Sequence, residues 1–225
     1  MRRGVWARGA VLFIAATVIS GLGAGVAEAR ASGRPAASVA IFSLDDVAPE
    51  LVFVPRGITP EQARRLRPSA VLVSTAGFHT GGRAIDLLVL NGREVLPPLP
   101  LGRPIFGYDA ARRQAWVDHR LQQPATMAFA AGPYFHAGGV ACQGYTPGTF
   151  CTARTVRRAL AVDTTGRYLL YIAYHGSLAH LPKFLGTYGV QGRPVRFLHG
   201  LGLDGGSSVQ GPVPVRFILR PRVTG

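Results

Sequence analysis

The chain has 225 residues, 48% of them hydrophobic, and carries 25 Lys and Arg against 11 Asp and Glu, for a formal net charge of +14. This length suits one domain with a sizeable hydrophobic core. The arginines are scattered and form no dense basic tract, which argues against nucleic acid as a partner and favours anionic wall polymers, lipid head groups or a phosphate-bearing substrate.

The N-terminal segment has the pattern of a secretory signal peptide. Arg2, Arg3 and Arg8 form a basic start, an apolar stretch begins at Val11, and Ala-Glu-Ala at residues 27–29 supplies a cleavage site. An uncleaved membrane anchor is the alternative interpretation of the same residues. Cleavage would place the mature protein outside the cytoplasm, either secreted or in the periplasm or cell envelope, with no membrane span left.

These boundaries predict the organisation of the whole chain. Residues 1–29 are the expected signal peptide, residues 30–38 a flexible leader, and residues 39–225 one domain. The sequence leaves the oligomeric state open.

Most of the domain shows the pattern of short strands separated by turns. Helix-start signals occur at Thr59-Pro60 and at Ser177, and predict helices over residues 60–66 and 177–188. Turn residues predict hairpins around Asn91-Gly92 and around residues 164–166. Strands are expected at residues 39–42, 51–54, 70–74, 85–90, 105–109, 114–117, 125–131, 158–162, 168–174, 193–198, 201–203 and 213–219. Many strands with few helices predict an α+β fold whose sheet is mainly antiparallel or mixed.

The two cysteines, Cys142 and Cys151, flank a turn-rich loop. In an exported protein such a pair is typical of a structural disulfide, which the sequence favours over a metal site or a redox pair. No set of metal ligands is visible, and no cofactor is identified, although a divalent metal is compatible with phosphate chemistry.

Asp204 is the most informative side chain. It follows a strand-like apolar segment, precedes two glycines and two serines, and is the last acidic residue of the chain. A carboxylate at a strand end, beside backbone that can approach a ligand closely, is a common way to build a polar site. The alternative is a turn residue that caps its own Gly-Gly bend.

Several short segments, in order, resemble the phosphodiester glycosidase family. The Leu-Asp-Gly-Gly-Ser-Ser run at 203–208 is similar to the family's Leu-Asp-Gly-Gly-Gly-Ser hallmark, and Thr-Ala-Gly-Phe-His at 75–79 to its Asn-Ala/Gly-Gly-Phe-Phe turn. Leu-Asn-Gly at 90–92, Ala-Gly-Pro at 131–133 and the Arg-led strand at 157–163 follow the same order. The resemblance implies hydrolysis of a sugar-1-phosphodiester or a related glycosidic bond.

This resemblance suggests roles for particular residues. Asp204 would be the acid/base or nucleophilic carboxylate, and Arg157 would bind phosphate oxygens, for which a planar guanidinium is well shaped. For Arg157 an exposed strand residue is the alternative interpretation. The predicted substrate-binding residues are Thr75, Gly77, His79, Gly205, Gly206, Ser207 and Ser208.

Four positions depart from the family pattern. Thr75 and Gly202 stand where the family has Asn, Ser207 stands where it has a third Gly, and His79 stands where an aromatic is common. A divergent enzyme and a member that has lost activity both fit these differences. The sequence therefore predicts an exported hydrolase acting on a phosphate-bearing glycan. A non-catalytic envelope module that binds anionic glycans or phosphate-bearing polymers is the alternative, and a structural secreted domain is the third.

Overall fold

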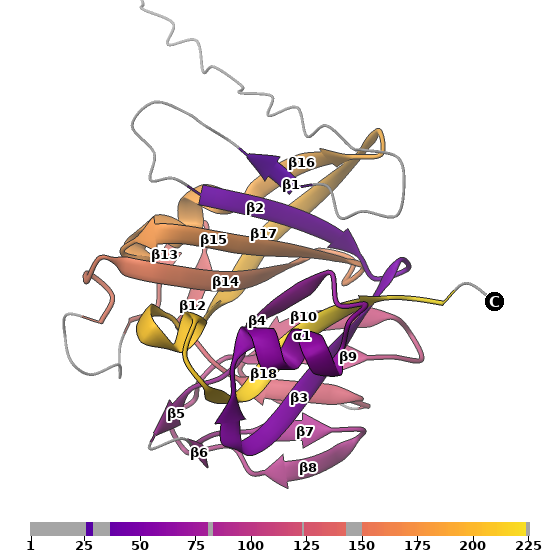
Figure 1. Ribbon diagram of the computed structural model, residues 1–225. Helices are drawn as coiled ribbons and strands as arrows, with labels where there is room; N and C mark the ends of the chain where they lie inside the picture. The colour runs from indigo at the N-terminus through magenta and orange to yellow at the C-terminus, as the bar shows by residue number, and fades with distance from the viewer. Residues whose placement is uncertain (1–25, 29–36, 81–82, 123, 143–149, 224–225) are drawn as a thin grey trace, which may run out of the picture.

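The computed structural model describes residues 26–28, 37–80, 83–122, 124–142 and 150–223 (Figure 1). Most of the predicted signal peptide and leader lies outside these residues. The exceptions are strand β1 (Val26–Glu28), which pairs with β2, and the start of β2 (Ala37–Ser43) itself. Within the described part of the chain, no helix is long and apolar enough to cross a membrane.

The largest sheet forms the upper layer in Figure 1. Its strands run in the order β1-β2-β15-β14-β17-β12-β13, with β16 paired to β17, and every pairing is antiparallel. The bounds not yet given are β12 (Tyr134–His136), β13 (Gly139–Val140), β14 (Thr155–Asp163), β15 (Tyr168–Gly176), β16 (Gly186–Val190) and β17 (Arg193–Leu203).

Three smaller sheets lie below it. One has the order β10-β9-β11-β7-β8, the second β3-β18-β4, and the third is the β5–β6 hairpin. Their bounds are β3 (Val47–Ile58), β4 (Leu72–Thr75), β5 (His79–Thr80), β6 (Arg83–Ala84), β7 (Leu88–Leu90), β8 (Arg93–Leu96), β9 (Ile105–Asp109), β10 (Gln114–Asp118), β11 (Met127–Ala130) and β18 (Val213–Pro221).

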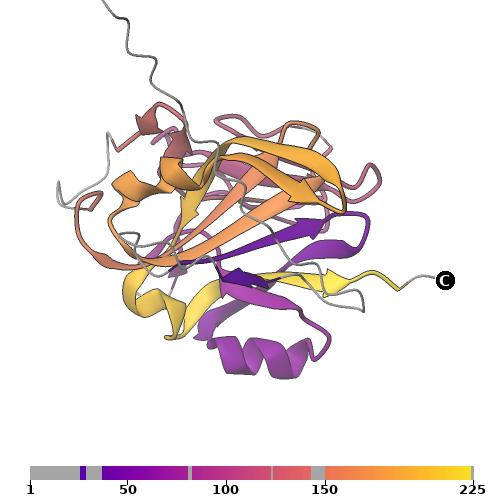
Figure 2. The ribbon, with the colours of Figure 1, turned by 90° about the horizontal axis from the view of Figure 1, so that it is seen from above.

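Helix α1 (Pro60–Leu66) confirms the first helix prediction. Thr59 and Gln62 form a capping box, in which each side chain accepts a hydrogen bond from the backbone N–H of the other residue. The helix lies on the side of the β3-β18-β4 sheet that faces away from the largest sheet (Figure 2).

The second predicted helix is wrong, and with it the α+β fold class. Leu178–Phe184 forms a 3₁₀ helix, η1, and the chain then returns as strand β16. Pro182 lies inside η1, where it lacks the N–H that a continuing α-helix needs. Apart from α1, η1 and the short 3₁₀ turn η2 (Gly206–Val209), the regular structure of the described residues is β-strand, so the fold is β-rich and mainly antiparallel.

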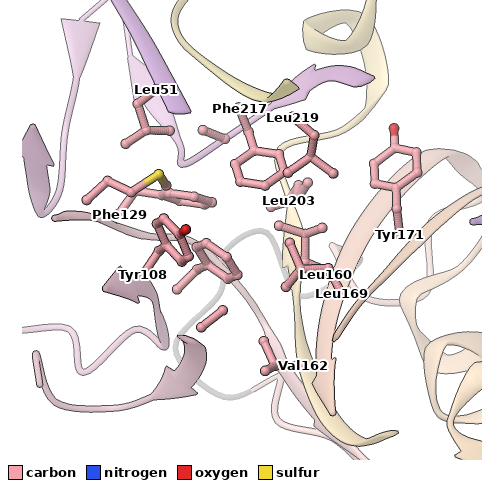
Figure 3. Packing of buried hydrophobic residues seen from close by; sticks show 14 of the residues in the cluster. Leu51, Tyr108, Phe129, Leu160, Val162, Leu169, Tyr171, Leu203, Phe217 and Leu219 are labelled. Carbon is pink, nitrogen blue, oxygen red and sulfur yellow. The ribbon is translucent and has the colours of Figure 1, made fainter. Parts of the chain in front are cut away.

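The core lies between the largest sheet and the smaller sheets. In β14, Leu160 and Val162 face this core, whereas Ala159 and Ala161 face a second cluster on the other side of the sheet. Figure 3 shows the first cluster, in which Leu160 and Leu203 of the largest sheet lie opposite aromatic side chains of the smaller ones.

The predicted disulfide is confirmed. Cys142 and Cys151 are bonded, with their Cα atoms 6.2 Å apart. The backbone N–H of Leu178 donates to the carbonyl of Cys151 at 3.0 Å, so the bridge is attached to the start of η1.

Close packing at Gly200 gives a test of the fold. A Cβ there would lie 2.3 Å from the carbonyl oxygen of Leu160 and 2.7 Å from Cζ of Phe135, whereas a Cβ at Gly189 would meet nothing within 4 Å. We expect Gly200→Ala to lower the free energy of unfolding by about 1–3 kcal/mol, and Gly189→Ala to change it by less than about 1 kcal/mol. Urea denaturation of both variants would measure this, and equal losses would contradict the packing described here.

Candidate active site

The end of β17 and the end of β4 meet at Asp204. The backbone N–H of Asp204 donates to the carbonyl of Ala76 at 3.2 Å, and the buried Thr75 hydroxyl donates to the Asp204 carbonyl at 2.5 Å. The site residue therefore sits at the junction between the largest sheet and the β3-β18-β4 sheet. Thr75 holds the backbone of Asp204 and does not contact its carboxylate.

The carboxylate of Asp204 is surrounded by hydrogen-bonding groups. Its Oδ2 lies 3.3 Å from Nε2 of His79, and its Oδ1 accepts the backbone N–H of Gly205 at 2.9 Å. The Ser208 hydroxyl also donates to the carboxylate, and its Oγ lies 3.3 Å from Nε2 of His79. The predicted site residues Asp204, His79 and Ser208 thus form one cluster, although His79 and Ser208 are 129 positions apart.

His79 presents its two nitrogens to different surroundings. Nε2 faces Asp204 and Ser208, whereas the buried Nδ1 has no hydrogen-bond partner among the residues that the structure describes. A buried N–H without an acceptor is rarer than an unpaired lone pair, which favours the tautomer with the proton on Nε2. In that tautomer His79 donates toward the carboxylate of Asp204.

Burial raises the pKa of Asp204 above the usual aspartate value. The Ser208 hydroxyl, His79, the Gly205 N–H and the positive charge of Arg216 oppose this shift by favouring the ionised form. The side chain keeps 16% of its surface exposed, so a ligand can reach it. A raised carboxyl pKa in a cluster of proton donors is typical of acid–base sites.

Glycines allow the backbone to pack closely around the site. A Cβ at Gly205 would lie 2.7 Å from the carbonyl oxygen of Val156, and a Cβ at Gly77 would lie 2.3 Å from that of Ala130. Gly206 has a φ of +60°, in the region that glycine adopts most readily. Ser207 is exposed, and its carbonyl accepts the backbone N–H of Gly211 at 2.9 Å. These residues shape the turn around Asp204.

Arg157 is buried, and its guanidinium is occupied. It donates to the carbonyls of Phe150 and Ala153 at 2.8 Å each and to that of Gly176 at 3.4 Å. It also lies over the Phe150 ring, 5.3 Å from the ring centroid. Its predicted role in phosphate binding stays a prediction. To serve that role, the guanidinium would have to give up these carbonyl contacts.

Arg216 is the residue that the sequence analysis missed. It is fully buried, and its guanidinium donates to the carbonyls of Ile58 at 3.1 Å, Val209 at 3.3 Å, and Gly211. Burial lowers its pKa to about 10, and the charge of Asp204 partly offsets that shift. The available signal was a charged residue with apolar neighbours on both sides, in the stretch of residues 213–219.

Among the described residues, no group of three or more His, Cys, Asp or Glu side chains is placed to hold a metal ion.

No protein-family model matches this chain, and neither does any curated protein. Several solved structures share its fold, among them the following two. A hypothetical protein from Synechocystis matches with a TM-score of 0.65 and 12% identity over 88% of this chain, which spans 61% of that protein. The catalytic domain of zebrafish N-acetylglucosamine-1-phosphodiester alpha-N-acetylglucosaminidase matches with a TM-score of 0.62 and 14% identity, covering 88% of this chain and 82% of that one.

Proposed function

We propose that this protein is a hydrolase that cleaves a sugar-1-phosphodiester or a related glycosidic bond. The observation that carries the proposal is the cluster of Asp204, His79 and Ser208 at the end of β17, with a buried carboxyl of raised pKa at its centre. The likeness of the fold to a phosphodiester glycosidase catalytic domain supports the same class of chemistry.

Asp204 would act in its ionised form. In hydrolysis of a glycosyl phosphate, a bond forms between the water oxygen and the anomeric carbon, and the bond from that carbon to the phosphate oxygen breaks. The phosphate leaves with the electron pair, and Asp204 takes the proton from water. A phosphate ester is a stable leaving group, so base assistance at water matters more than acid assistance at the leaving oxygen.

The neighbours of Asp204 prepare it for this step. His79 and Ser208 both donate toward the carboxylate, which fixes its orientation before the substrate arrives. Burial makes the carboxylate a stronger base than an exposed aspartate, because it raises the pKa. The backbone amide of Gly206 and the exposed Ser207 lie beside it as the proposed contacts of the substrate, whereas the Gly205 N–H is already donated to Asp204 Oδ1.

Export of the protein is part of the same proposal. The Cys142–Cys151 disulfide is typical of proteins that fold outside the cytoplasm. Outside the cytoplasm the protein would encounter its proposed substrate, a phosphate-bearing or anionic glycan. The basic composition of the chain suits such a substrate.

The direct test is turnover by the purified protein. We expect release of N-acetylglucosamine from an N-acetylglucosamine-1-phosphodiester, followed by mass spectrometry, with related sugar phosphodiesters and simple aryl glycosides tested in parallel. No turnover of any of these by a folded protein would overturn the proposal. The non-catalytic glycan-binding module would then become the better interpretation.

The pH dependence of the reaction tests the state of Asp204. Because the ionised form is the active one and burial raises the pKa, we expect kcat/KM to fall as the pH drops through a value above 3.8, the ordinary aspartate pKa. A pH–rate profile would locate this acidic limb. A rate that instead rises as the pH drops through the same range would show that the protonated carboxyl is the active form.

A further inference from the structure

A pocket adjoins the hairpin that carries His79. It has a volume of about 620 Å³ and combines two arginines, Arg56 and Arg83, with the apolar side chains of Phe53, Leu96 and Pro214. These residues come from β3, β6, β8 and β18, which meet where β6 lies beside the end of β3 (Figure 1). The pocket therefore offers positive charge and apolar surface together.

No carboxylate among the described residues neutralises the charge of this pocket. No acidic residue lines it, and neither Arg56 nor Arg83 forms an ion pair with a carboxylate of the described residues. Both arginines are exposed.

Another arginine-lined pocket, of about 570 Å³, differs in this respect. Arg112 lies 2.8 Å from Asp109, and Arg113 and Arg167 lie 3.5 and 3.3 Å from Asp45. Its arginines already have partners of opposite charge. An added anion would gain more in the pocket of Arg56 and Arg83, where it would meet two guanidinium groups with no carboxylate beside them.

The pocket lies next to the candidate active site. In the β5–β6 hairpin, His79 is the register partner of Ala84, which lines the pocket, and Thr80 is the partner of Arg83. Directly opposed residues of antiparallel strands have Cα atoms about 4.5–5.5 Å apart. Strand β6 also contacts β18, and the chain reaches β18 directly from the segment that holds Ser208. A molecule bound at Asp204 could thus extend across the hairpin into this pocket.

We infer that the pocket binds a phosphate group that carries an apolar substituent. Arg56 and Arg83 hold the phosphate oxygens, and Phe53, Leu96 and Pro214 cover the substituent. The assignment of this pocket as the site for the leaving-group end of the substrate rests on the proposed function. The pocket supplies the phosphate recognition that Arg157 does not offer in this structure, because the Arg157 guanidinium is hydrogen-bonded to three carbonyls.

Phenyl phosphate is the probe for this pocket, because it joins a phosphate to a small apolar group. Calorimetric titration should show saturable binding that weakens by at least about tenfold in an Arg56→Gln/Arg83→Gln double variant. Inorganic phosphate should bind more weakly than phenyl phosphate, because it lacks the apolar part. Arg193→Gln is the matched control, since Arg193 is exposed at the far end of β17 from Asp204 and should leave binding unchanged.

Absence of binding, or equal binding by the wild type and the double variant, would overturn the inference. Circular dichroism of the double variant shows that any loss does not come from unfolding.

An Asp204→Asn protein separates this inference from the proposed function. It should bind phenyl phosphate as tightly as the wild type, because the arginines and the apolar surface are unchanged. Binding without turnover by the wild type would support the pocket and overturn the hydrolase. Turnover that is inhibited by phenyl phosphate only in proteins that keep Arg56 and Arg83 would support both. Turnover that neither phenyl phosphate nor the double substitution affects would overturn the pocket alone.

Discussion

The Asp204→Asn variant should lose about 10²–10⁴-fold in hydrolytic rate while keeping its fold. Asparagine has nearly the same shape, and its carbonyl oxygen can still accept the Gly205 N–H that Oδ1 accepts now. It cannot take a proton from water, so the chemical step should fail while substrate binding persists. Steady-state kinetics would show the loss in kcat with little change in KM.

The stability of the same variant distinguishes a catalytic carboxylate from a structural one. The raised pKa means that the folded state holds the Asp204 proton more tightly than the unfolded state does. The stability contributed by this group is therefore present below the unfolded pKa and lost as the pH rises through the folded pKa. At pH 7 we expect Asp204→Asn to unfold at the same temperature as the wild type or a higher one, with the difference narrowing toward pH 4.

Asp118→Asn is the matched control for this comparison. The side chain of Gln122 and the backbone N–H groups of His119 and Arg120 lower the pKa of Asp118, so its ionised form stabilises the folded state. That substitution should lower the melting temperature at pH 7 and leave turnover unchanged. A clear loss of stability in Asp204→Asn would show instead that the ionised carboxylate holds the turn together.

Local patterns predicted the hairpins well. Asn91 and Gly92 have φ values of +51° and +76°, as the Asn-Gly turn between β7 and β8 requires. The turn at residues 164–166 also forms, and the Asp163 carboxylate accepts the backbone N–H groups of Thr165, Arg167 and Tyr168 there. These structures depend on residues close together in the sequence, so the sequence alone could reveal them.

The prediction of the second helix was wrong because its signals were equally local, and the pairing of β16 with β17 overrode them. Ser177 has the extended conformation of an N-cap, yet its side chain makes no capping hydrogen bond. The segment after Leu185 pairs with β17 over Gly186–Val190, which no helical pattern could have indicated. Strand pairing with a partner outside the segment decided the outcome.

The candidate site depended on contacts that local patterns do not predict. Nothing in the spacing of His79 and Ser208 indicates that they meet, and only the family resemblance placed them together. The sequence also did not indicate on which face of β14 the Arg157 side chain lies. It lies on the same face of β14 as Ala159 and Ala161, which pack in the second cluster, whereas Leu160 and Val162 face the main core. A sequence pattern gives the alternation of the two faces but not which face holds the site.

The second large effect is expected at Arg216. Arg216→Met would leave the carbonyls of Ile58, Val209 and Gly211 without their guanidinium donor in a fully buried position. Removing one partner of a buried charged network typically costs about 3–5 kcal/mol, and we expect a loss of that order in the free energy of unfolding. Urea denaturation would measure it as a lower midpoint with an unchanged slope.

Arg220→Met is the control for this loss, because Arg220 lies on the same strand with 44% of its side chain exposed. Arg220 pairs with Glu50 at 2.5 Å, and Glu50 keeps a second partner in Arg67 at 2.6 Å, so the loss of this partly exposed pair should cost only about 0–1 kcal/mol. Similar losses in the two variants would contradict a special role for the buried guanidinium.

Arg216 also links the stability of the β3-β18-β4 sheet to the chemistry at Asp204. Its positive charge is one of the groups that lower the pKa of Asp204 against the effect of burial. Without that charge the pKa of Asp204 should rise further, so the acidic limb of the pH–rate profile of Arg216→Met should move to higher pH. Arg216→Lys keeps a positive charge but has fewer hydrogen-bond donors. We therefore expect it to bring the acidic limb back toward its wild-type position while recovering less of the lost free energy of unfolding. A shift of the limb that lysine reverses would identify Arg216 as a positioning residue acting on Asp204 through its charge. If the acidic limb of the pH–rate profile does not move in Arg216→Met, the role of Arg216 is purely structural.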